Sequence, residues 1–79
     1  MALIRSLKEQ QSASASNRPH SQVDATWRKV LTESGQTLFQ LDTYGSDEQK
    51  ATGQASQNIQ VDRDTAVALI AILQKTFSI

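Results

Sequence analysis

The sequence contains no cysteine, and only one proline and one histidine, among its 79 residues. Disulfides and thiolate metal sites are therefore excluded, although these commonly stabilise chains too short to bury a large core. Oligomerisation remains as a way to stabilise so short a chain, so we expect the protein to oligomerise. Long apolar runs are also missing: no stretch approaches the roughly 20 residues of a membrane span. The N-terminus lacks the apolar core of a signal peptide, which predicts a cytoplasmic protein without a membrane partner.

Groups able to perform catalysis are scarce. His20 stands in a small, polar stretch, where it is expected to be exposed and without a nucleophile. Of the two acidic pairs, Asp47 with Glu48 belongs to a predicted loop, and Asp62 with Asp64 is explained by helix capping. Glycine-rich phosphate motifs are absent. The sequence therefore predicts a protein that is not an enzyme and that holds no metal or cofactor.

The chain divides at about residue 21. Residues 10–22 are small and polar; residues 1–21 carry a net charge of +2, whereas residues 22–79 carry −2. We interpret the first part as a flexible tail and the second as a single domain. The segment from Leu3 to Leu7 has three possible conformations: a frayed end, a short helix, or an edge strand added to the sheet of a neighbouring subunit.

Apolar and polar residues alternate in three short segments, which predicts strands. The first begins at Val23, with Lys29 as an exception on its apolar side, and the second covers residues 37–44. Gly35 between them suits the turn of a β-hairpin. Residues 45–55 form a long loop, and residues 56–61 a third strand. On this pattern Trp27, Leu31, Phe39 and Leu41 share one face, which we expect to lie against a helix.

A C-terminal helix follows Asp62, a suitable N-cap, with Asp64 in its first turn and Lys75 near its end. One stripe of the helix is expected to be covered by the sheet: Ala66, Leu69, Ile70, Leu73 and Phe77. The fold class is therefore α+β, with a small antiparallel sheet of three to four strands followed by one C-terminal helix.

Residues 66–73 are apolar without interruption, so the helix is apolar on more than one side. We predict that the apolar positions facing away from the sheet, together with Ile70 of the stripe, form the interface of a twofold homodimer. These positions are Val67, Ile70, Ala71 and Ile72. The alternative is that the N-terminal segment, through Leu3, Ile4 and Leu7, covers them.

The opposite face of the strands is rich in amide and hydroxyl groups, which donate and accept hydrogen bonds. It displays Arg28, Gln40, Asp42, Tyr44, Asn58 and Gln60. Such a face suits nucleobase edges or a protein surface, and Tyr44 can stack on a base. An ordinary solvated sheet face is the alternative. The predicted nucleic-acid-binding residues are Arg28, Lys29, Gln40, Tyr44, Lys50, Asn58 and Gln60.

The order of elements resembles the single-stranded-DNA-binding domain of positive-cofactor-four-type transcriptional coactivators and their small bacterial relatives. The likeness rests on Gly35, the strand from Leu38 to Tyr44, Gly53, the strand from Ser56 to Val61, and the helix after Asp62. It implies a dimer that lays single strands across curved sheets. The chain departs from the family in its loop, which carries Asp47 and Glu48 with Lys50 as its one basic residue.

Residues 39–46 and 56–62 also resemble a group of very small, uncharacterised bacterial proteins. Two hypotheses result. The first is a dimeric binder of single-stranded DNA or RNA, to which Arg5, Lys8 and Arg18 add nonspecific attraction. The alternative is a protein-interaction module, an accessory or inhibitory subunit, which the negative charge of residues 22–79 favours.

Overall fold

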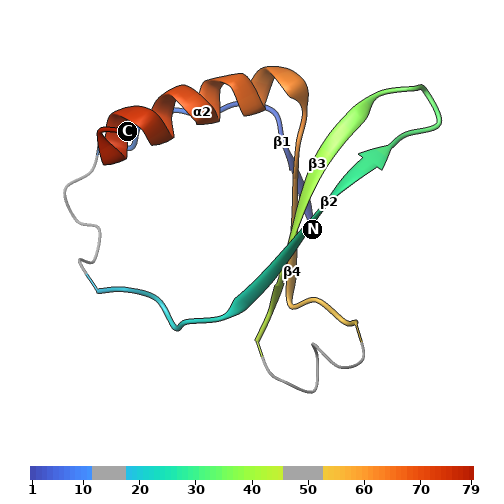
Figure 1. Cartoon of the computed structure of the whole chain (residues 1–79), viewed down its shortest axis with the longest axis horizontal. Coiled ribbons are helices and arrows are strands. Elements are labelled where there is room, and N and C mark those ends of the chain that lie inside the picture. The colour runs from blue at the N-terminus through green and yellow to red at the C-terminus, as the bar shows by residue number, and fades with distance from the viewer. Residues whose placement is uncertain (12–17, 46–52) are drawn as a thin grey trace.

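A computed structural model of the chain describes residues 1–11, 18–45 and 53–79. Its strands form one sheet in the order β1-β4-β3-β2, and helix α2 follows the last strand (Figure 1). The elements are β1 (Ala2–Ile4), β2 (Asp24–Leu31), β3 (Thr37–Tyr44), β4 (Gln57–Val61) and α2 (Arg63–Phe77). The predicted α+β class, a small sheet followed by one C-terminal helix, is confirmed.

Strands β2 and β3 form the predicted hairpin, with Trp27 opposite Leu41 and Lys29 opposite Phe39. Gly35 adopts a φ of 87° in the turn, a conformation that favours glycine. Thr32 holds the turn together, because its backbone N–H donates to the Gln36 carbonyl at 2.9 Å and its hydroxyl oxygen accepts from the Gln36 N–H at 3.0 Å. The third predicted strand, β4, pairs antiparallel with β3.

Strand β1 lies inside the range predicted as a flexible tail, and that prediction does not hold for these residues. It pairs in parallel with β4 of its own chain, with Ile4 beside Val61, so the sheet is mixed rather than purely antiparallel. The Thr65 hydroxyl also donates to the Ile4 carbonyl at 3.2 Å. The backbone bonds to β4 and this contact with the helix are the interactions that order the segment.

Helix α2 begins as its sequence predicts. Asp62 is the N-cap, and its carboxylate accepts a hydrogen bond from the Thr65 backbone N–H at 2.9 Å. This bond lowers the pKa of the Asp62 carboxyl below its usual value. The helix ends at Phe77, and its C-cap Ser78 adopts the left-handed conformation with a φ of 55°.

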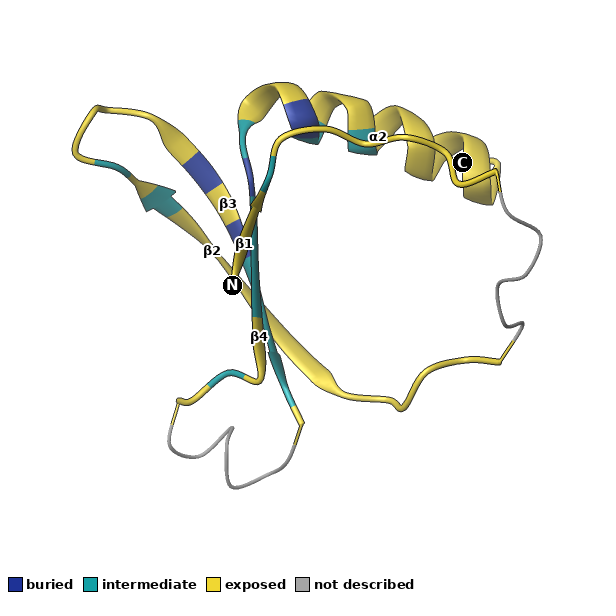
Figure 2. Ribbon diagram, turned by 180° about the vertical axis from the view of Figure 1, so that it is seen from behind, coloured by how far each residue is buried: buried dark blue, intermediate teal, exposed yellow. Residues whose placement is uncertain are grey.

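The expectation that the sheet covers the apolar stripe of α2 is wrong. The helix points away from the sheet, and it is exposed over most of its length (Figures 1 and 2). Thr65 is its one buried residue, and Ile70 is 56% exposed. Asp62 alone separates β4 from α2, and its extended backbone continues the direction of the strand. With this one-residue connection the helix leads away from the sheet and does not turn back over it (Figure 1).

The N-terminal segment gives α2 partial cover, and of the three residues named in the alternative interpretation, Leu3, Ile4 and Leu7, it is Leu7 that lines a pocket with the helix. Leu7, Lys8 and Glu9 line a shallow pocket together with four helix residues. The helix residues of this pocket are Leu69, Ile72, Lys75 and Thr76. The cover is limited, because Leu7 and Ile72 both remain exposed.

Among the described residues, the buried apolar side chains are Leu38 at 5% exposure and Val61 at 6%. The pairing register places Val61 on the same face as Phe39, whereas Leu38 is opposite Val30 on the other face. Burial is therefore split between the two faces of the sheet, and the described part of the chain contains no single large core.

We expect Leu38→Ala to destabilise the protein by about 2 to 4 kcal/mol, because it removes one of the few buried apolar side chains and leaves a cavity. Urea unfolding followed by circular dichroism, at one fixed protein concentration, measures this change. Leu31→Ala is the matched control, since Leu31 is 73% exposed on the neighbouring strand, and it should change the stability by less than about 0.5 kcal/mol. Equal losses in the two variants would contradict the assignment of Leu38 to the core.

We expect Asp62→Ala to lower the thermal unfolding midpoint by a few degrees, because alanine cannot accept the Thr65 N–H bond at the helix N-terminus. Asp62→Asn retains an acceptor and should cause a much smaller drop. Helical ellipticity against temperature checks both variants, and equal midpoints for them would show that the cap adds no stability.

Candidate nucleic-acid interface

The pairing register brings most of the predicted binding residues onto one face of the sheet. Arg28 on β2 is opposite Gln40 on β3, and Gln40 is opposite Gln60 on β4. Two positions further along β3, on the same face, Asp42 is opposite Asn58. We call Arg28, Gln40, Asp42, Asn58 and Gln60 the polar cluster.

The Asp42 carboxylate organises the polar cluster. Its Oδ1 atom accepts hydrogen bonds from Asn58 Nδ2 at 2.6 Å and from Gln40 Nε2 at 2.8 Å. Gln60 Nε2 donates in turn to Gln40 Oε1 at 2.8 Å. Gln40, at the centre, is only 7% exposed. These bonds hold the three amides in fixed orientations.

The same contacts change the acidity of Asp42. The hydrogen bond from Asn58, then that from Gln40, lowers the pKa of the Asp42 carboxyl, and the nearby Arg28 guanidinium adds to the effect by charge attraction. Asp42 is therefore ionised at neutral pH. A negative charge lies at the middle of the polar cluster, with one cation beside it.

The network leaves acceptors for a ligand. The recorded bonds use an N–H of Asn58 and of Gln60, so the side-chain carbonyl oxygens of both residues remain available. Between the polar cluster and β1 there is a pocket of about 400 Å³. It is lined by Met1, Ala2, Leu3, Arg28, Gln40, Asn58 and Gln60.

Tyr44 is the last residue of β3, two residues after Asp42, so its side chain lies on the same face of the sheet. Its hydroxyl is 3.1 Å from Thr26 Oγ1 on the neighbouring strand, which restrains the ring. The ring is only partly buried, so a base or another planar group has access to it. Sequence reasoning did not identify Thr26 as a partner, although the strand alternation places it on this face.

Two predicted binding residues do not join the polar cluster. Lys29 is on the opposite face, where it pairs with Phe39 and lines an apolar groove. Lys50 lies outside the described residues. Arg28 is therefore the basic residue that the polar cluster contains.

Within residues 1–11, 18–45 and 53–79, no group of three or more histidine, cysteine, aspartate or glutamate side chains is arranged to hold a metal ion. In the same part of the chain no helix has the length and apolar character needed to cross a membrane.

The sequence matches no protein-family model, and neither curated proteins nor solved structures give a match. The likeness to the coactivator fold therefore remains a prediction. The geometry of this chain is therefore the basis on which its function is inferred.

We expect the side-chain amide NMR signals of Asn58 and Gln40 to shift together as the Asp42 carboxylate is protonated, and to do so below the usual carboxyl pKa of 3.8. Because folding lowers this pKa, the stability that the carboxylate contributes is present above pH 3.8 and is lost as the pH falls through the lowered value. The shift should disappear in Asp42→Asn. A titration at or above pH 3.8 would contradict the network.

Proposed function

We propose that this protein binds single-stranded nucleic acid across the polar cluster and Tyr44, and that it does so as a homodimer. The observation that carries the proposal is the row of amides held in place by Asp42. Fixed amide groups on an open sheet face can form hydrogen bonds with the edges of unpaired bases. A cytoplasmic location is part of the same proposal, because nucleic acid is present there.

Tyr44 favours a single strand over a duplex. Aromatic side chains in single-strand binders stack on bases, and each such contact contributes about 1 to 3 kcal/mol. Bases in a duplex are already stacked on one another, so this contact is not open to them. The partial exposure of the ring supports stacking, and its bond to Thr26 reduces the cost of ordering it.

The charged residues determine the expected affinity for nucleic acid and how that affinity depends on salt. Each phosphate neutralised in a single strand contributes a slope of about −0.7 to the log–log dependence of affinity on salt. Arg28 is next to an ionised Asp42, so the sheet face offers few phosphate contacts. Arg5, Lys8 and Arg18 in the N-terminal region add nonspecific attraction. We therefore expect modest affinity and a shallow salt slope.

A protein-interaction module, acting as an accessory or inhibitory subunit, is the second candidate. The observation that favours it is the amount of apolar surface left open on α2 and on the second face of the sheet. The acidic balance of residues 22–79 points the same way, because it disfavours nucleic acid.

Fluorescence anisotropy of labelled single-stranded and double-stranded oligonucleotides, titrated at several salt concentrations, tests the proposal. We expect preference for the single strand and a negative salt slope. Tyr44→Ala should weaken binding by about 1 to 3 kcal/mol, whereas Tyr44→Phe keeps the stacking surface and should bind almost as the native chain does.

Arg28→Ala and Lys29→Ala form a matched pair, because the two residues are adjacent but lie on opposite faces of the sheet. Arg28→Ala should make the salt slope shallower by about 0.7, and Lys29→Ala should leave it unchanged. Absence of binding at low salt would exclude the nucleic-acid proposal and leave the interaction module, for which a pull-down at low salt would identify the partner.

A further inference from the structure

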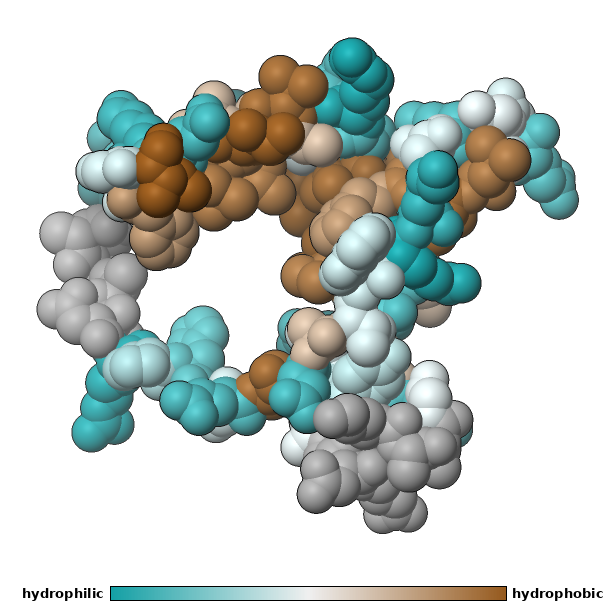
Figure 3. Space-filling view, viewed as in Figure 1, coloured by the Kyte–Doolittle hydropathy of each residue, from teal (hydrophilic) through white to brown (hydrophobic). Residues whose placement is uncertain are grey.

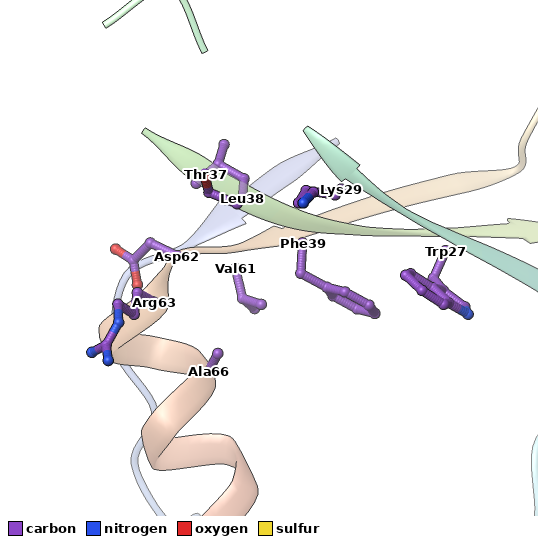
Figure 4. A pocket seen from close by; sticks show the side chains of 9 residues that line it. All are labelled: Trp27, Lys29, Thr37, Leu38, Phe39, Val61, Asp62, Arg63 and Ala66. Carbon is purple, nitrogen blue, oxygen red and sulfur yellow. The ribbon is translucent and has the colours of Figure 1, made fainter. Parts of the chain in front are cut away.

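The second face of the sheet carries an apolar groove where β4 meets α2. It has a volume of about 530 Å³, and Trp27, Phe39, Val61 and Ala66 lie along it (Figure 4). The Trp27 and Phe39 rings are stacked, with centroids 6.0 Å apart and an angle of 22° between their planes. Trp27 is nevertheless 70% exposed. A pair of stacked aromatic rings with this much open surface indicates that something covers it.

Helix α2 carries a second apolar surface that continues from the groove. Ala66 lies in the groove, and Ile70, Leu73 and Phe77 follow it at i+4, i+7 and i+11, so they share one side of the helix. We call these four residues the helix stripe. The three distal residues are exposed. Figure 3 shows apolar side chains on the helix and on the adjoining sheet around an open hollow.

We infer that a second copy of this chain fills the groove, with the helix stripe of each copy packed on the Trp27 and Phe39 rings of the other. The two surfaces are complementary in chemistry, since both are apolar. The helix is also long enough to cross the sheet: its 15 residues extend over about 22 Å, and the four strands span about 14 Å. We call this arrangement the exchange. In it, the sheet of one copy covers the helix stripe of the other, whereas within one chain the connection at Asp62 leads the helix away from its own sheet.

The exposed area favours a second copy of the chain. Among the described residues, large apolar side chains stay exposed on both surfaces: Trp27 and Phe39 in the groove, and Ile70, Leu73 and Phe77 on the helix. Two copies that pack the helix of one on the groove of the other would remove both surfaces from water. Obligate homodimers bury 2,000 Å² or more and are the more hydrophobic class of interface.

Charge favours the same arrangement. Lys29, Arg63 and Asp62 line the groove, so its charged groups carry a net charge of +1, and the C-terminal end of a helix carries partial negative charge. The distal half of the helix stripe, Leu73 and Phe77, belongs to that end. Lys75 lies on a different side of the helix, in the pocket with Leu7, so it does not oppose the groove cations.

The exchange rests on the homodimer of the proposed function but not on its ligand. In a dimer built only through α2, the helix of one copy would pack on the helix of the other. In the exchange, the helix of each copy packs on the sheet of the other. Val67 and Ala71, predicted at the interface, lie beside the helix stripe and remain compatible with contact between the two helices once exchange has brought them together.

Disulfide trapping tests the exchange. The native chain has no cysteine, so no native thiol can form a competing disulfide. In the variant Lys29→Cys/Leu73→Cys, we expect oxidation to give a covalent dimer on a non-reducing denaturing gel. Arg28→Cys/Leu73→Cys is the matched control, with its first cysteine on the polar face, and it should remain monomeric. Efficient dimers of Leu73→Cys alone, or closure of the disulfide within one chain, would overturn the inference.

The native chain supplies an independent test, because Trp27 is its only tryptophan. On dilution without nucleic acid, we expect the mass from sedimentation to halve while the Trp27 emission shifts to longer wavelength. Leu73→Asp should give the monomer mass and the shifted emission at all concentrations. A native chain that is monomeric, or a dimer whose Trp27 emission matches exposed tryptophan, would overturn the exchange. A monomeric native chain would also overturn the homodimer in the proposed function, but neither outcome depends on oligonucleotide binding, so the nucleic-acid part of that function is decided by its own titration.

Discussion

The connection at Asp62 is the constraint on which the rest of the structure depends. Val61 ends β4 and Arg63 begins α2, so one extended residue decides where the helix goes. A longer connection would let the helix turn back onto the sheet, as it does in many small α+β folds. Here the chain instead presents a sheet and a helix whose apolar sides are both open. A chain this short has little other apolar surface to bury.

The strand register divides the sheet into two chemically distinct faces. One face carries the polar cluster, in which Asp42 is the shared acceptor and no described buried side-chain polar atom lacks a partner. The other carries Trp27 and Phe39, with Val61 beside them. Because side chains alternate along each strand, a slip of one residue would exchange the two faces. The amide bonds and the apolar contacts therefore both oppose a change in register.

Much of this fold could be predicted from the sequence, because it follows from local patterns. The period of two in β2 and β3, the glycine at 35 and the cap at Asp62 depend on neighbouring residues only. The path of α2 depends on the backbone angles of Asp62, which hydrophobic periodicity does not predict. Strand β1 needed a tertiary partner, since three residues at a chain end show no period of their own. Local rules therefore identified the elements but not how they meet.

The candidate site shows the same division between local and tertiary information. Alternation placed Gln40, Asn58 and Gln60 on one face. It could not show that Asp42 accepts hydrogen bonds from Gln40 and Asn58, or that Gln40 accepts one from Gln60. It also placed Lys29 on the apolar side, an exception that looked like a fault in a strand pattern. The structure gives this exception a physical role: the lysine lines the open groove, where an isolated chain would gain little from a cation. A cation there is useful if the negative end of another helix occupies the groove, and the proposed exchange between two copies would supply such a helix.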